Sequence, residues 1–549
     1  MNRTGPMENE FVFDSHRSPV YSRGGMVASS QPLATAAGIK ILAAGGNAAD
    51  AAIATAAALN VTEPTSTGLG GDCFSLYFEA ATKKVYALNG SGRAPACLDL
   101  SKLQKEGLGE ELPPFHPYTI TVPGACAGWL DLLERFGKLP VSTVLEPAIK
   151  LAEKGFPVAP LTSWFWRRGA DHQLKAALNG VELTIDGRGP NLGEIFRNPG
   201  LAKTLKRIAR EGKCGFYSGE IAKAIVAIIK EAGGCMTGED LGRHISTWEE
   251  PISVLYRGVR VWECPPNGQG LVALLALNLL SGFVLSDMPA LSAERLHLEI
   301  EALRLAFADG RAHISDPAFQ KIPLKELLSV EYSNTRRKEI HLNKAIELPQ
   351  PGELNMGTDT VYFCAVDGEG NACSFINSNY MGFGTGIVPR GWGFSLQNRG
   401  HNFSLDPNHP NHLEPGKRPY HTIIPGMATR ESDGSLYAPF GVMGGFMQPQ
   451  GHVQVISALL DDGLDPQSAL DRPRFCIDGE NLQAPVDVEE GIPAREISKL
   501  EKMGHSVNLV SGMGRALFGR GQIITRDPET GVLCGGSDPR ADGCAMSVL

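Results

Sequence analysis

The chain has 549 residues and the composition of an ordinary globular protein, 42% hydrophobic and 20% charged, with a formal net charge of −9. This length exceeds what one compact core usually holds, so we expect two or more lobes or one large layered domain. The acidic balance argues against nucleic-acid partners and anionic membrane surfaces, because both require a basic protein face.

The N-terminal segment gives no targeting or membrane signal. Residues 1–24 carry charges throughout and lack an apolar core, so they predict a loose arm and no signal peptide. The most apolar early stretch, AADAAIATAAALNV, contains Asp50 and is too short to span a bilayer. We therefore expect a cytoplasmic protein.

The first hundred residues predict a helix pair followed by a hairpin. In QPLATAAGIKILAAGGNAADAAIATAAALN, helical spacing holds through Ala44, Gly45–Gly46 form a stop, and Asn47 can cap a second helix. Alanine at nearly every inward position allows the two helices to pack closely. CFSLYFE at 73–79 and KVYALNG at 84–90 predict the two strands of a hairpin.

Helices dominate the middle of the chain, and strands return later. The pattern is mostly helical from about 98 to 233 and strand-like over 251–264, with helices over 271–280 and 292–313. Residues 316–354 are polar and suit an exposed connector. VYFCAV, the turn DGEGN and ACSFIN predict a hairpin over 361–377, and helices follow near 451–461 and 495–503. This order favours stacked layers of sheet and helix.

The sequence lacks the motifs of several common kinds of binding or catalytic site. GFGTGI at 382–387 and VMGGFMQPQG at 442–451 match neither a dinucleotide nor a P-loop pattern, and no G-x-S-x-G elbow occurs. The eleven cysteines include no C-x-x-C pair, so they predict neither a zinc site nor a disulfide framework, and most should be buried thiols. The histidines His401, His409, His412 and His421 lie in a Pro/Asn-rich loop, where hydrogen bonding is favoured over metal binding.

Two threonines, Thr358 and Thr360, precede the apolar strand in NMGTDTVYFCAVDGEGNACS. Threonine simply suits strands, which is one interpretation. The other is that cleavage makes a threonine N-terminal, so that its own α-amino group, with a pKa of about 7.7–8.0, serves as the base for its hydroxyl. The residues alone leave both interpretations open.

A series of segments spread over nearly the whole chain favours the second interpretation. They include GGNAADAAIATAAALNVTEPTSTGLGGD, GTDTVYFCAVDGEGNACS, GKRPYHTIIPGM, MGGFMQPQGHVQV, ALDRPRF and GGSDPRADG. On these the chain resembles the γ-glutamyltransferase (glutathione hydrolase) family of N-terminal-nucleophile hydrolases. The resemblance implies an α+β fold, a four-layer αββα sandwich. It also implies self-cleavage between Asp359 and Thr360 into a large subunit, 1–359, and a small subunit, 360–549, which fold together and can form a higher oligomer.

The resemblance also implies roles for particular residues. Thr360 would be the nucleophile, Ser378 would hydrogen-bond it, and the backbone N–H groups of Gly444 and Gly445 would receive the oxyanion. An acyl-enzyme would form and be released by water or an amine, with no metal or organic cofactor. The chain looks closest to the signal-less cytosolic branch, similar to cephalosporin acylases and oxamate amidohydrolase.

The positions that read a γ-glutamyl group depart from the family pattern. Ser91 replaces an arginine, with Arg93 the nearest guanidinium, Asn402 replaces an acidic residue, and His421–Thr422 replace a serine pair. A bidentate arginine clamp is hard to replace, and a buried ammonium group without its carboxylate is costly. Arg93, Arg399 or Arg418 could bind a different carboxylate or serve in ordinary salt bridges.

Three functions follow as hypotheses. The first is a self-processing amidohydrolase or acyltransferase for a glutathione-like or other small carboxylate-bearing amide. The second is an amidase for a substrate that is not a γ-glutamyl compound, such as an oxamate-like or glutaryl amide. The third is a binding protein that has kept the fold and lost the chemistry.

Overall fold

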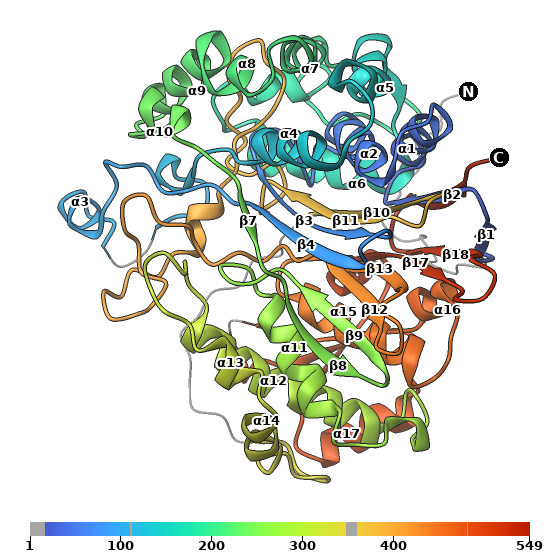
Figure 1. Cartoon of the computed structure of the whole chain (residues 1–549). Coiled ribbons are helices and arrows are strands. Elements are labelled where there is room, and N and C mark those ends of the chain that lie inside the picture. The colour runs from blue at the N-terminus through green and yellow to red at the C-terminus, as the bar shows by residue number, and fades with distance from the viewer. Residues whose placement is uncertain (1–16, 110–111, 347–359, 480) are drawn as a thin grey trace, which may run out of the picture.

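The computed structural model describes residues 17–109, 112–346, 360–479 and 481–549. Two large antiparallel sheets stack face to face, and helices cover the outer face of each (Figure 1). The αββα sandwich predicted from the sequence is therefore confirmed. The residues on either side of the expected cleavage point, Thr358 and Asp359, lie outside the described residues.

The first sheet carries the hairpin that begins beside Thr360. Every residue of β10 and β11 is buried, because helices cover one face and the second sheet covers the other. Its strand order is β19 (Cys544–Ser547), β2 (Gly25–Ser29), β10 (Val361–Asp367), β11 (Ala372–Ser378), β3 (Asp72–Glu79), β4 (Lys84–Gly90) and β7 (Thr247–Glu249).

The second sheet packs directly on β10 and β11. Apolar side chains from both sheets form the core between them, including Phe74, Tyr362 and Met427. Gly441 allows the sheets to approach, because a Cβ there would lie 2.5 Å from the ring of Tyr362. The strand order is β1 (Val20–Ser22), β18 (Leu533–Ser537), β17 (Arg520–Arg526), β13 (Leu436–Met443), β12 (Gly426–Arg430), β9 (Val259–Glu263) and β8 (Ile252–Tyr256).

The helical layer on the first sheet starts with the predicted helix pair. Asn47 caps the second helix in a capping box with Asp50, and a Cβ on Gly38 would lie 2.3 Å from Thr55 Oγ1, so the two helices pack closely as expected. The layer consists of α1 (Pro32–Ala43), α2 (Ala48–Thr62), α4 (Ala125–Phe136), α5 (Val141–Lys154), α7 (Pro199–Glu211), α8 (Lys213–Tyr217) and α9 (Gly219–Glu231).

The layer on the second sheet contains α11 (Gly270–Leu280), α12 (Ala293–His313), α15 (Met447–Leu460), α16 (Pro466–Asp471) and α17 (Ala494–Lys502). Three further helices are α3 (Leu100–Lys105), α6 (Pro160–Gly169) and α10 (Gly238–Gly242). Two small sheets consist of β5 (Phe156–Pro157) with β6 (Ile195–Phe196), and of β14 (Phe475–Cys476) with β15 (Val486–Glu489) and β16 (Val507–Val510). The short helical segments are η1 (Pro117–Thr119), η2 (Ala170–Leu174), η3 (Gly180–Leu183), η4 (Leu285–Asp287), η5 (Arg399–Asn402) and η6 (Gly512–Phe518). Across the four described ranges, no helix combines the length and the apolar character needed to cross a bilayer.

Three expectations about local structure were wrong. The arm over 1–24 contains β1, which is held by pairing with β18, a partner far along the chain. The connector expected over 316–354 contains α13 (Leu324–Leu327) and α14 (Val330–Arg337) within its described part, and Ser329 caps α14. Cys97 and Cys235, with Cα atoms 6.3 Å apart, form a disulfide. Their separation of 138 residues explains why the sequence did not predict the pair.

Candidate functional site

Thr360 lies one residue before β10 and is buried. In the β10–β11 hairpin Val361 lies opposite Asn377, so the next pair outward brings Thr360 to Ser378, with their hydroxyl oxygens 3.0 Å apart. Ser378 Oγ accepts hydrogen bonds from Tyr380 N at 2.8 Å and from Arg399 Nη2 at 3.2 Å. Ser378 thus lies at the centre of a hydrogen-bonded group that contains the Thr360 hydroxyl.

Arg399 is a fully buried cation beside this hydroxyl pair. Its Nη1 donates to Thr422 Oγ1 at 2.7 Å, and its guanidinium lies 4.3 Å from the centre of the Tyr380 ring. No carboxylate in the described part of the chain lies within ion-pair distance of Arg399, and its Nε has no hydrogen-bond partner there. Burial lowers the pKa of Arg399 to about 10, although Asp72 and Tyr380 act in the opposite direction. The guanidinium therefore has donor capacity for an anion.

His421 and Asp72 form a buried pair next to Arg399. His421 Nε2 lies 3.0 Å from Asp72 Oδ2, and its Nδ1 accepts from Ile423 N, so the neutral ring donates to the carboxylate. Burial first, and then the charge of Arg399, lowers the pKa of His421 to about 3. Asp72 Oδ1 also accepts from Gln397 Nε2 at 3.0 Å and from two backbone N–H groups, so the carboxylate already has four donors.

The double glycine lies at the turn between β13 and α15. Gly444 has a φ of +137° and Gly445 a φ of +58°, a region that favours glycine. The Gln269 side-chain amide donates to the Gly445 carbonyl at 2.8 Å and to the Thr422 carbonyl at 2.6 Å. The double glycine is thus tied through Gln269 and Thr422 to the hydrogen-bonded group of Arg399, Ser378 and Thr360.

The other predicted substrate-binding residues have structural partners. Arg93 donates to the Ile245 carbonyl at 3.3 Å and lies near the surface. Arg418 is buried, donates to the Ser91 carbonyl at 3.2 Å and pairs with Glu249 at 3.4 Å. Asn402 donates to the Tyr420 carbonyl at 3.0 Å. Of the candidate cations, Arg399 is the one that the structure brings to Thr360.

A cavity of about 1120 Å³ opens beside Gly444. Helix α6 and the turn at Met381–Phe383 form one wall, and the start of α15, residues 476–479 and 484–487, and η6 form the other. Aromatic and aliphatic side chains dominate the lining. Thr360, Ser378, Arg399 and Thr422 do not line it.

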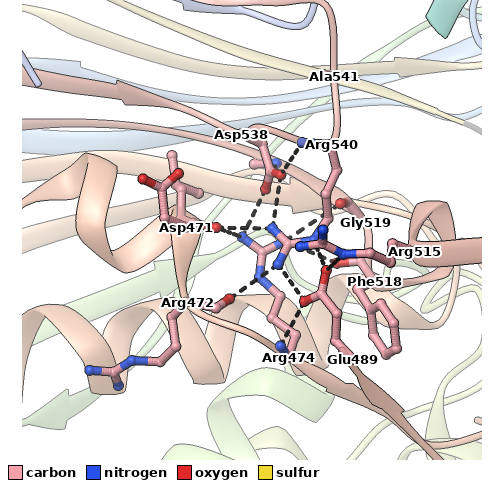
Figure 2. A network of polar contacts seen from close by, with 12 residues as sticks. Asp471, Arg472, Arg474, Glu489, Arg515, Phe518, Gly519, Asp538, Arg540 and Ala541 are labelled. Atoms are coloured by element: carbon pink, nitrogen blue, oxygen red, sulfur yellow. Dashed lines mark hydrogen bonds and ion pairs between the residues drawn. The ribbon is translucent and has the colours of Figure 1, made fainter. Parts of the chain in front are cut away.

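A buried network of charged side chains supports the second wall of this cavity (Figure 2). Arg540 donates to Glu489 at 2.7 Å and to Asp538 at 3.0 Å, and Arg474 donates to Asp538 at 2.8 Å and to the Phe518 carbonyl at 2.9 Å. Burial alone would raise the pKa of Asp538, but the two guanidinium groups bring it below the ordinary value. Because Phe518 ends η6, the network fixes the segment that lines the cavity.

One group of side chains has the composition of a cation site. His297, Glu301 and His505 place their ligand atoms within 4.8 Å of one another. His297 Nε2 donates to the His341 carbonyl at 2.6 Å, so its Nδ1 accepts from His505 Nε2 at 2.7 Å. His505 Nδ1 then accepts from Arg304 Nη1 at 3.4 Å. Every ring nitrogen has a role in this chain, and the adjacent arginine disfavours a cation, so hydrogen bonding accounts for the group.

Sequence reasoning missed two residues of the site, Asp72 and Gln269. Asp72 ends the Gly-rich stretch GLGGD, in which a Cβ on Gly71 would lie 2.1 Å from the Ser378 carbonyl oxygen. That glycine run before a strand was the available signal for a close approach. Gln269 lies in the turn PPNGQG and gave no comparable signal.

Comparisons with known proteins identify the family of the chain. The family model described as gamma-glutamyltranspeptidase matches residues 34–548. The chain is 38% identical to the glutathione hydrolase-like YwrD proenzyme of Bacillus subtilis, covering 95% of this chain and 98% of that protein. It is 33% identical to the oxamate amidohydrolase proenzyme of Klebsiella pneumoniae, covering 96% and 99%. The structure of cephalosporin acylase from Bacillus halodurans superposes with a TM-score of 0.91 at 46% identity, covering 99% of both chains. The chain belongs to the γ-glutamyltranspeptidase family of N-terminal-nucleophile hydrolases and is a proenzyme amidohydrolase.

Proposed function

We propose that the chain cuts itself between Asp359 and Thr360 and that Thr360 then hydrolyses a small amide whose acyl half carries a carboxylate. The observation that carries this proposal is the contact of 3.0 Å between Thr360 Oγ1 and Ser378 Oγ, in a buried position beside Arg399. Cleavage would yield a large subunit, 1–359, and a small subunit, 360–549.

The chemistry follows from this geometry. The freed α-amino group of Thr360, with a pKa of about 7.7–8.0, takes the hydroxyl proton as Oγ1 attacks the amide carbonyl. The hydrogen bond with Ser378 orients Oγ1, and the backbone N–H groups of Gly444 and Gly445 receive the oxyanion. The amine half leaves with a proton, the acyl group stays on Thr360, and water releases it as a carboxylic acid.

The carboxylate of the acyl half would bind Arg399. Two N–H groups of Arg399 already donate to Thr422 and Ser378, and these hydrogen bonds fix the position of the guanidinium. A γ-glutamyl group would also need an acceptor for its α-ammonium, but the Asp72 carboxylate is already engaged by four donors. We therefore favour an acyl half with a carboxylate and no ammonium, such as an oxamate-like or glutaryl group. A glutathione-like substrate is the second candidate, because the YwrD proenzyme is described as glutathione hydrolase-like.

Two measurements test the proposal. The purified protein should run as two fragments, with the small one starting at Thr360. Thr360→Ala should stay in one piece, whereas the matched control Thr358→Ala should still be cut. Rates with a glutaryl amide, oxamate, glutathione and γ-glutamyl-p-nitroanilide then rank the acyl groups. A trapped acyl group on Thr360 excludes the catalytically silent binding protein, and an active, uncut chain contradicts the proposal.

A further inference from the structure

The cavity beside Gly444 is larger than a small amide requires. Ligand sites commonly enclose about 300–1,000 Å³, and this one encloses about 1120 Å³. Release of ammonia or a short amine would leave most of that volume filled with water. The size therefore indicates a second, bulky part of the substrate.

The position of the cavity identifies which part it receives. The two halves of an amide leave the carbonyl carbon in different directions. Arg399 donates to Ser378 and Thr422, and none of these three residues lines the cavity. Gly444, in contrast, forms part of the cavity wall. With the acyl carboxylate at Arg399, the cavity lies in the path of the amine half.

The lining indicates the chemistry of the occupant. Five aromatic rings and a leucine line the cavity, from Phe115, Trp164, Phe165, Phe383, Phe446 and Leu517. The rings of Trp164 and Phe165 lie 4.8 Å apart at 86°, which forms a corner that suits a flat ring in edge-to-face contact. Ionisable residues of both kinds lie on the walls, the basic Arg168 and His172 and the acidic Asp478 and Asp487, so the cavity does not favour one net charge.

The walls are fixed before any substrate enters. Phe383 N donates to Gln173 Oε1 at 3.2 Å, and the Phe518 carbonyl next to Leu517 accepts from Arg474 at 2.9 Å. A preformed apolar surface binds without the cost of ordering loops. We infer that this cavity binds the amine half of the substrate and that this half is a bulky, neutral aromatic group. The inference rests on the proposed function.

The test holds the acyl group constant and varies the amine. Glutaryl amides of ethylamine and of naphthylethylamine are compared on the processed enzyme, because the ring is two carbons from the nitrogen and leaves its basicity nearly unchanged. We expect kcat/KM for the naphthyl compound to be at least about tenfold higher, the range that apolar pockets provide. Leu517→Ala should lower this ratio. Leu509→Ala is the matched control, because Leu509 is 58% exposed against 38% for Leu517 and does not line the cavity.

A binding arm separates the two proposals. The neutral N-acetyl derivative of naphthylethylamine, measured by calorimetry against N-ethylacetamide, should bind wild type and the Leu509→Ala variant and bind Leu517→Ala more weakly. If that derivative binds but neither amide is hydrolysed, the cavity inference stands and the proposed function fails. If both amides are hydrolysed equally and the derivative does not bind, the cavity inference is wrong and the proposed function stands. If nothing binds and nothing is hydrolysed, both are wrong.

Discussion

Arg399 and Arg540 are both fully buried, yet the structure predicts opposite consequences for replacing them with methionine. Arg540 contacts Glu489 and Asp538, and removing one partner of a buried ion pair costs about 3–5 kcal/mol because charges are left uncompensated. Arg399 has no carboxylate partner among the described residues, so its removal strands no charge.

The energy for Arg399 can be worked from its surroundings. Burial shifts its pKa from 12.5 to about 10. At about 1.4 kcal/mol per pKa unit, holding the charge in the folded chain costs on the order of 3 kcal/mol. The cost is present in full below pH 10, where both states are charged, and fades as the pH rises toward 12.5. The two hydrogen bonds that Arg399 donates go to neutral hydroxyls, and one is 3.2 Å long. Each therefore stabilises the folded chain by about 1.5 kcal/mol, the low end of the range for hydrogen bonds of charged groups. The two contributions nearly cancel.

Both substitutions should be made in the Thr360→Ala background, so that neither measurement depends on cleavage. In urea unfolding followed by tryptophan fluorescence, Arg399→Met should stay within about 1 kcal/mol of its parent, whereas Arg540→Met should lose about 3–5 kcal/mol. In the cleavable chain, Arg399→Met should lower kcat/KM by about 10²-fold, the equivalent of two charge-assisted hydrogen bonds to the substrate. Equal destabilisation by the two variants would show that Arg399 is a structural residue and refute the reasoning.

Three further predictions concern single residues. Ser378→Ala removes the hydrogen-bond partner of Thr360 and should lower kcat about 10–100-fold with little change in KM, measured by steady-state kinetics. Gly444→Ala puts a Cβ 3.1 Å from Gly519 Cα at a φ of +137°, so the folded protein should lose activity while its circular dichroism is retained. His244 has both ring nitrogens buried without partners among the described residues, and burial lowers its pKa to about 3. The unfolded state takes up this proton below about pH 6.5, whereas the folded state keeps the ring neutral down to about pH 3, so the free energy of unfolding decreases as the pH falls between these values. His244→Phe should reduce this decrease by up to about 1.4 kcal/mol per pH unit, measured by comparing the free energies of unfolding at pH 7 and pH 4.

The sequence predicted those parts of the molecule whose signals are local. The hairpin around Thr360 was readable because two apolar runs flank the turn DGEGN, and Asn47 follows a double-glycine stop where a cap is needed. The order of the strands within the two sheets was not predicted. Strand β1 was missed because three residues carry little pattern and its partner β18 lies more than 500 residues away.

The site divides in the same way. Thr360 immediately precedes β10 and Ser378 ends the neighbouring β11, so placing the hairpin also places the pair. His421 and Asp72 are 349 residues apart, and no local pattern relates a histidine in a proline-rich loop to an aspartate at the head of a strand. Arg399 was one of three candidate arginines, and only burial and the positions of potential partners separate it from Arg93 and Arg418.

The residues expected to depart from the γ-glutamyl pattern all have hydrogen-bond partners in the structure. Ser91 Oγ accepts from Asn267 Nδ2 at 3.1 Å, Asn402 is bonded to the Tyr420 carbonyl, and His421 is bonded to Asp72. Loss of function by drift would leave buried polar groups unpaired at these positions, and that is costly. Each replacement instead has a partner, while Arg399 keeps donor capacity beside Thr360. These contacts are why the function proposed above has an acyl half that carries a carboxylate without an ammonium group.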